Sequence, residues 1–92
     1  TVGDNTVLSY NVSVTHSTHI GKNCYLAFGV MLGAYTIVED FVFIGIGAIV
    51  ISGKVDSIGT FASIGAGAVV TKSVASYECV AGNPAKFIKT LK

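Results

Sequence analysis

The 92-residue chain carries a formal net charge of +1, and 51% of its residues are hydrophobic while only 12% are charged. This length fits one domain, and the weak charge excludes the basic footprint that nucleic-acid binding needs. The richest apolar stretch, residues 41–51, is well short of the roughly 20 residues that span a bilayer, so we also expect no membrane partner.

An aliphatic residue recurs at every sixth position, with one slip of two residues. A helix repeats its apolar residues every three or four positions and a strand every two, so a period of six fits neither. Hexapeptide periodicity is typical of parallel β-helices, in which each unit is one short strand and a bend. We therefore predict an all-β solenoid domain over residues 1–75, with inward ladders such as Val2, Ile20, Val38 and Ile58. The repeated aliphatics are Val2, Leu8, Val14, Ile20, Leu26, Leu32, Val38, Ile44, Val50, Ile58, Ile64 and Val70.

Two further segments depart from the repeat. Two extra residues within 51–57 predict a local bulge, since insertions in repeat proteins emerge as loops on one face. Residues 76–92 form a C-terminal tail, in which Asn83 followed by Pro84 resembles a helix N-cap with proline at the first helical position. We therefore expect a short helix ending at Leu91 that packs back on the solenoid.

The cysteines and the first residue indicate the cellular compartment. Cys24 and Cys79 are too few for a disulfide framework, which indicates free thiols in a reducing cytoplasm. The chain opens on Thr1 in phase with the repeat, so we expect no signal peptide and further residues upstream. The apolar composition predicts that another subunit covers part of the surface.

The candidate chemistry lies at His16. It falls two positions after Val14, so its side chain leaves the prism near a bend. Imidazole takes a proton near neutral pH, which suits a general base. From the residues alone, His16 is either an exposed polar side chain or such a base, and His19 is a surface or subunit-contact residue.

Two motifs carry a family resemblance. Residues 64–72 read IGAGAVVTK and residues 80–86 read VAGNPAK. Together they resemble the terminal signature of hexapeptide-repeat acyltransferases with a left-handed β-helix, and the resemblance covers essentially the whole chain. Residues 16–21, HSTHIG, are similar to the segment with the catalytic base in the sialic-acid O-acetyltransferase and bacterial amino-sugar N-acetyltransferase branch.

The resemblance implies acetyl transfer from acetyl-CoA to a sugar hydroxyl or amine, with His16 as general base and no metal. It implies a homotrimer with the coenzyme between neighbouring prisms. Ile46 and Ala66 match backbone contacts to the pantetheine arm of the coenzyme. Gly47 and Gly67 permit that close approach.

Other positions depart from the family pattern or stay open. Tyr25 takes the place of a second histidine that contacts the acetyl group, and its hydroxyl still donates a hydrogen bond. Ser17 replaces an acidic neighbour of the base. Lys86 is either a contact to a coenzyme phosphate or a solvated lysine. The branch also carries an N-terminal nucleotide-sugar-binding domain, which these residues do not contain.

Two other functions fit the same solenoid. A γ-class carbonic anhydrase shares the prism and the trimer, but its zinc needs three imidazoles where this chain has two histidines. A catalytically silent solenoid that trimerises an attached domain is supported by Ser17 and Tyr25. Saturable binding of acetyl-CoA separates an acetyltransferase from that silent form.

Overall fold

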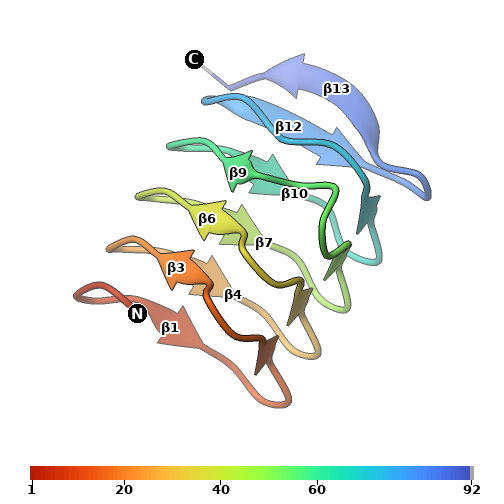
Figure 1. Cartoon of the computed structure of the whole chain (residues 1–92). Helices are drawn as coiled ribbons and strands as arrows, with labels where there is room; N and C mark the ends of the chain where they lie inside the picture. Colours follow the sequence, from red (N-terminus) through yellow and green to blue (C-terminus); the bar gives the residue numbers. More distant parts are fainter. Residues whose placement is uncertain (92) are drawn as a thin grey trace.

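The six-residue repeat gives one short strand per unit in the computed structural model, which describes residues 1–91 (Figure 1). The two-residue strands in this span are β1 (Val7–Leu8), β2 (Ser13–Val14), β3 (His19–Ile20), β4 (Tyr25–Leu26), β5 (Met31–Leu32), β6 (Ile37–Val38), β7 (Phe43–Ile44), β8 (Ile49–Val50), β9 (Ser57–Ile58), β10 (Ser63–Ile64) and β11 (Val69–Val70). Two longer strands follow, β12 (Glu78–Ala81) and β13 (Lys86–Thr90). Nowhere in residues 1–91 is there a helix long and apolar enough to cross a membrane.

The strands stack into three sheets, which we number in the order in which the chain visits them (Figure 1). Sheet 1 is β1-β4-β7-β10-β12-β13, sheet 2 is β2-β5-β8-β11, and sheet 3 is β3-β6-β9. Neighbouring strands run parallel, except that β13 is antiparallel to β12. Because the chain visits the sheets in fixed rotation, they form the three sides of a triangular prism.

The inward aliphatics form ladders along the prism axis, as the sequence predicts. Val2 pairs with Ile20, Ile20 with Val38, and Val38 with Ile58. In the first coil Val2, Leu8 and Val14 remain 48%, 40% and 38% exposed, whereas from Ile20 onward the repeated aliphatics are buried. Burying each of these later side chains stabilises the fold by about 1.5–3 kcal/mol. The stack therefore gives a small chain a continuous core. Its completely buried aliphatics include Leu26, Val30, Leu32, Ile44, Ile58 and Ile64.

The three corners of the prism share one backbone conformation. We call them the 1–2, 2–3 and 3–1 corners after the sheets that they join. The second residue of each turn has a positive φ, which asparagine and glycine adopt most readily. Aromatic residues occupy several of these positions, which a bulky side chain rarely does. The non-glycine residues concerned are Asn5, Asn11, Ser17, Asn23, Tyr35, Phe41, Phe61 and Tyr77.

The predicted bulge lies at the 2–3 corner, between β8 and β9. Residues 52–54 form its turn, and Val55 then returns to the core. The hydroxyl of Thr36 donates to the carbonyl of Val55 at 3.2 Å, so the buried threonine ties this coil to the preceding one. Throughout the part of the chain that the structure describes, every buried side-chain polar atom has a hydrogen-bond partner.

The predicted C-terminal helix is wrong. Pro84 lies in the turn between β12 and β13, and its peptide bond with Asn83 is cis. Lys86–Thr90 then pairs with β12 as an antiparallel strand. The physical reason is that β12 presents unpaired backbone groups at the edge of sheet 1, and a strand satisfies them whereas a helix does not. Val80 of β12 is buried above Ile64, so sheet 1 continues past the predicted domain boundary at residue 75.

Candidate functional site

His16 lies on the outside of the 2–3 corner, in the turn between β2 and β3. Its imidazole meets the ring of Tyr35 edge to face, with ring centroids 5.3 Å apart and planes at 87°. The preceding residue, Thr15, donates its hydroxyl to the carbonyl of Leu32 at 2.9 Å, which ties this turn to the next coil. Among residues 1–91, the Tyr35 ring is the contact that the structure records for the imidazole.

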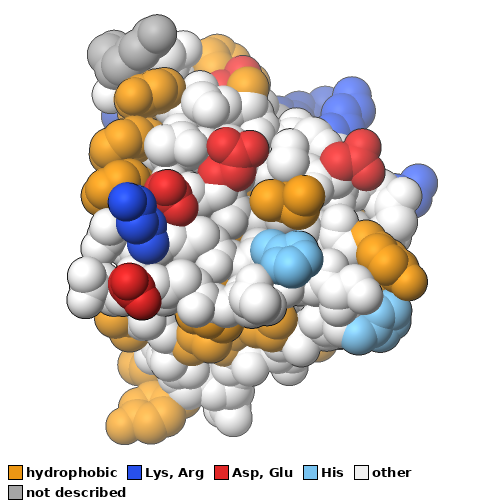
Figure 2. Space-filling model, turned by 60° about the vertical axis from the view of Figure 1, so that its left-hand side comes forward, with side chains coloured by type: hydrophobic (Ala, Val, Ile, Leu, Met, Phe, Trp, Pro, Cys, Tyr) orange, Lys and Arg blue, Asp and Glu red, His pale blue; other side chains and the backbone are white. Residues whose placement is uncertain are grey.

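His19 has a different setting. It lies in β3 with its side chain on the outer face of sheet 3, where Nδ1 and the hydroxyl of Thr1 share a hydrogen bond of 2.7 Å. Both imidazoles are exposed on the face of the molecule shown in Figure 2. His19 therefore has a hydrogen-bond partner within the coil stack, whereas the recorded contact of the exposed His16 is the ring of Tyr35.

Tyr25 lies on the outer face of sheet 1. Its ring stacks on that of Phe43 in the next coil, with centroids 5.8 Å apart and planes at 18°, and 43% of the residue is exposed. Neighbouring Leu26 points inward and is completely buried. The alternation of the strand thus presents the Tyr25 hydroxyl away from the core.

The four candidate residues at the 1–2 corner stack in two successive coils. The amide of Gly67 donates to the carbonyl of Ile46 at 2.7 Å. Within the described residues the amides of Ile46 and Ala66 donate to no carbonyl of the solenoid. A Cβ added at Gly47 or Gly67 would meet no atom within 4 Å. The corner therefore exposes bare backbone over two coils.

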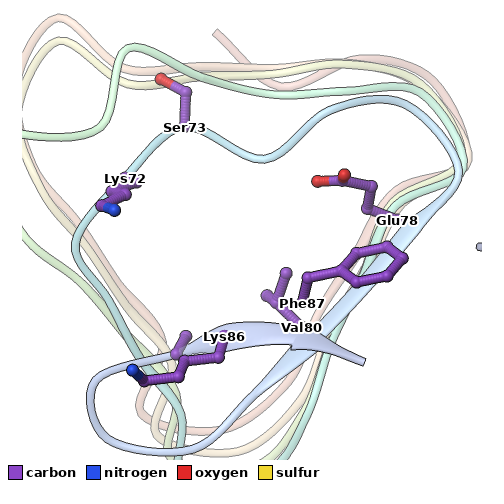
Figure 3. A pocket seen from close by; sticks show the side chains of 7 residues that line it. Lys72, Ser73, Glu78, Val80, Lys86 and Phe87 are labelled. Carbon is purple, nitrogen blue, oxygen red and sulfur yellow. The ribbon is translucent and has the colours of Figure 1, made fainter. Parts of the chain in front are cut away.

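Lys86 lies at the start of β13, beside a cavity of about 370 Å³ at the C-terminal end of the prism (Figure 3). Glu78 accepts the amide of Ala75 at 3.1 Å through Oε1. Lys72 lines the same cavity and escaped the sequence analysis, although it closes the IGAGAVVTK motif. The lining residues are Lys72, Ser73, Glu78, Val80, Ala85, Lys86 and Phe87.

The prism brings most of these residues together and leaves one apart. Tyr25 lies on sheet 1, and Ile46 and Ala66 lie at the 1–2 corner where that sheet ends. His16 lies at the 2–3 corner, which is the corner opposite sheet 1. One chain therefore does not place its own His16 beside its own Tyr25. Residues 1–91 also contain no group of three His, Cys, Asp or Glu side chains able to hold a metal ion.

The chain is similar in sequence to known acyltransferases. No protein-family model matches it. It is 36% identical over 96 aligned residues to a Schizosaccharomyces pombe protein assigned as an acetyltransferase, covering 100% of this chain and 44% of that protein. It is 37% identical over 91 residues to the UDP-3-O-acylglucosamine N-acyltransferase of Caulobacter sp. strain K31, covering 97% of this chain and 26% of that protein. The chain thus spans less than half the length of these relatives.

Solved structures of acetyltransferases also superpose on the chain. Neisseria gonorrhoeae serine acetyltransferase superposes with a TM-score of 0.91 at 28% identity, over 99% of this chain and 38% of that one. The polySia-specific acetyltransferase NeuO superposes with a TM-score of 0.88 at 31% identity, over 97% of this chain and 50% of that one. These matches confirm the resemblance to hexapeptide-repeat acyltransferases. The left-handed parallel β-helix of hexapeptide-repeat acyltransferases is likewise confirmed as the fold. A serine acetyltransferase in complex with CoA superposes with a TM-score of 0.85 at 29% identity, over 95% of this chain and 38% of that one.

Proposed function

We propose that the protein is an acetyltransferase that moves an acetyl group from acetyl-CoA to a hydroxyl or amine of a sugar or nucleotide sugar. The observation that carries the proposal is the pairing of an exposed histidine at the 2–3 corner with a bare backbone corner on a chain similar to acetyltransferases. The similarity to a serine acetyltransferase solved with CoA supports the choice of coenzyme.

The proposed chemistry assigns a proton transfer to His16. A ring nitrogen of its imidazole takes the proton of the acceptor as the acceptor oxygen or nitrogen attacks the thioester carbonyl. Backbone amides steady the negative charge that develops on the carbonyl oxygen. The carbon–sulfur bond then breaks, and the imidazolium returns the proton to the departing thiolate. The step needs neither a metal nor a covalent enzyme intermediate.

The coenzyme is proposed to lie along the 1–2 corner. The amides of Ile46 and Ala66 are donors for the amide-rich pantetheine arm, and Gly47 and Gly67 leave the backbone uncovered. Tyr25, on the adjoining sheet, is proposed to donate its hydroxyl to the acetyl carbonyl. Lys86 supplies a positive charge for a coenzyme phosphate.

The site is proposed to form between the subunits of a homotrimer. His16 and the 1–2 corner face different directions on one chain, so a complete site takes His16 from one subunit and the corner from its neighbour. The exposed apolar side chains of the prism agree with such packing.

A sugar acceptor is favoured by the HSTHIG segment and by the likeness to NeuO. Serine is the second candidate acceptor, because serine acetyltransferases superpose equally well. Both acceptors present a hydroxyl to the same base, so the chemistry is unchanged.

The test compares His16→Ala with His19→Gln, its matched exposed control. Thiol release from acetyl-CoA is followed with sugars, amino sugars and serine as acceptors, and coenzyme binding is measured by calorimetry. We expect His16→Ala to lower turnover on the order of a hundredfold or more and to leave coenzyme binding largely intact. His19→Gln should keep both. Unchanged turnover in His16→Ala removes the residue from the mechanism, and a lack of saturable coenzyme binding supports the silent solenoid instead.

A further inference from the structure

Tyr35 occupies a position that core packing does not explain. It lies in the turn of the 2–3 corner one coil after His16, and 67% of it is exposed. Its φ of 63° is in the left-handed region, where a large side chain is disfavoured because its Cβ approaches the carbonyl oxygen. Asparagine or glycine fills many equivalent positions, such as Asn5, Asn23 and Gly47. An exposed tyrosine there costs free energy and buries little surface in return.

The contacts of the ring distinguish Tyr35 from the other aromatic residues at corners. Phe41, Phe61 and Tyr77 stack face to face along the 3–1 corner, with centroids 4.7 and 5.3 Å apart. They therefore stabilise one another. Tyr35 instead lies perpendicular to the imidazole of His16. Edge-to-face geometry is one of the two arrangements that such rings favour.

Of the residues that the structure describes, those next to His16 offer the imidazole no support other than the Tyr35 ring. By the 18-residue register that pairs Ser13 with Met31, the residue stacked over His16 is Ala34, whose methyl group is too short to hold an imidazole. Ser17, next in the chain, carries no charge that could hold the imidazole, whereas the segment that residues 16–21 resemble has an acidic residue there. A general base must be held in a productive orientation to work efficiently.

We infer that Tyr35 is a positioning residue for His16: its ring holds the imidazole in the orientation that accepts the acceptor's proton. The inference rests on the proposed function, in which His16 is the base. The ring takes the place of the missing carboxylate by packing instead of by hydrogen bonding. A tyrosine at an unfavourable backbone position is thereby explained by the contact that it makes.

Two variants test the inference without endangering the fold. Tyr35→Asn removes the ring and installs the residue that the chain itself uses at φ 58° in Asn5, Asn11 and Asn23. Tyr35→Phe keeps the ring and removes only the hydroxyl. We expect Tyr35→Asn to keep the melting temperature and to lower kcat about tenfold or more, with KM for acetyl-CoA within about twofold. Tyr35→Phe should keep more than about half of kcat.

Proton NMR supplies a readout that does not depend on turnover. The chain has two histidines, so His16→Ala and His19→Gln assign the imidazole signals. Ring current from Tyr35 should displace the His16 ring protons in the wild type and in Tyr35→Phe, and this displacement should vanish in Tyr35→Asn. The His19 signals serve as the internal control, because His19 pairs with Thr1.

The outcomes separate the two proposals. Unmoved His16 signals in Tyr35→Asn overturn the inference, as does a full kcat in that variant while His16→Ala is inactive. Equal losses in Tyr35→Phe and Tyr35→Asn also overturn it, since the hydroxyl and not the ring would then be at work. Full turnover in His16→Ala overturns the proposed function itself and the inference with it.

Discussion

His16 and Tyr25 lie on opposite sides of the prism, one at the 2–3 corner and the other on the outer face of sheet 1. Sheet 1 is the side that this corner does not touch, so the core of the solenoid separates the two side chains. A reaction that needs both therefore needs two copies of the chain. This relationship decides how the proposed site is best tested.

Mixed trimers of two inactive variants should recover activity. We expect His16→Ala, and a 1–2 corner variant such as Gly47→Asn, each to lose most turnover alone. If one subunit supplies His16 and the next supplies the corner, random 1:1 mixing leaves about one quarter of all sites intact, which is about one third of the sites in trimers that contain both variants. Co-expression with two affinity tags, followed by turnover of the doubly purified trimers, measures this fraction. A site built within one chain predicts no recovery, because every chain then carries a defect.

Gly47→Asn alone should separate coenzyme binding from stability. Gly47 has φ 71°, a Cβ added there would meet no atom within 4 Å, and asparagine already occupies this corner at Asn11. The fold should tolerate the change, whereas the new side chain would stand over the exposed backbone. We expect a melting temperature near that of the wild type and acetyl-CoA binding weakened about tenfold or more, as measured by calorimetry.

Gly45→Ala is the matched contrast two residues away. A Cβ at Gly45 would lie 2.6 Å from the amide nitrogen of Ala66, which is backbone and does not move aside easily. We expect this variant to lose about 1–3 kcal/mol of unfolding free energy, as overpacked sites do. Chemical denaturation checks it. Equal stability of the Gly45 and Gly47 variants would contradict the account of the corner.

The two cysteines should differ in reactivity. Cys24 is 2% exposed, burial raises the pKa of its thiol above the ordinary 9.0, and its sulfur lies 3.1 Å from the carbonyl of Glu39. Because the thiolate is the reactive form, Cys24 should resist alkylation in the folded protein while the half-buried Cys79 reacts. Mass spectrometry after iodoacetamide treatment resolves the two peptides. Preferential labelling of Cys24 would show that its coil opens.

The same shift has a consequence for stability. A thiol whose folded pKa lies above its unfolded value favours the folded state fully at pH below 9.0. That contribution is lost as the pH rises from there through the folded pKa. Cys24→Ala should therefore flatten the loss of unfolding free energy above pH 9, which denaturation at a series of pH values measures.

The fold was largely predictable because one rule governs every coil. The six-residue period alone determines that Ile20 stacks between Val2 and Val38, and the strand pairings confirm it. The tail has no such repeat. Phe87 and Ile88 are compatible with an apolar helix face or with a strand. The segment forms a strand because it pairs with the edge of β12, and this tertiary contact is not visible in the local sequence.

The candidate site was predictable in part. The position of His16 after Val14 indicates an exposed corner, and the structure places it in the 2–3 turn. The contact with Tyr35 was missed, although adding the 18-residue coil to His16 leads to the turn that holds it. The separation of His16 from Tyr25 follows only from the closed triangle, which local sequence does not display.

The reversed direction of β13 has a consequence for self-association. Sheets of stacked parallel strands are a ready template for fibres, since each edge offers the same hydrogen-bonding pattern to the next molecule. Here the last strand of sheet 1 runs against the others and carries Lys86 and Lys89. A second solenoid that met this edge of sheet 1 would find an antiparallel strand with two lysines, which is a poor template for continued parallel stacking.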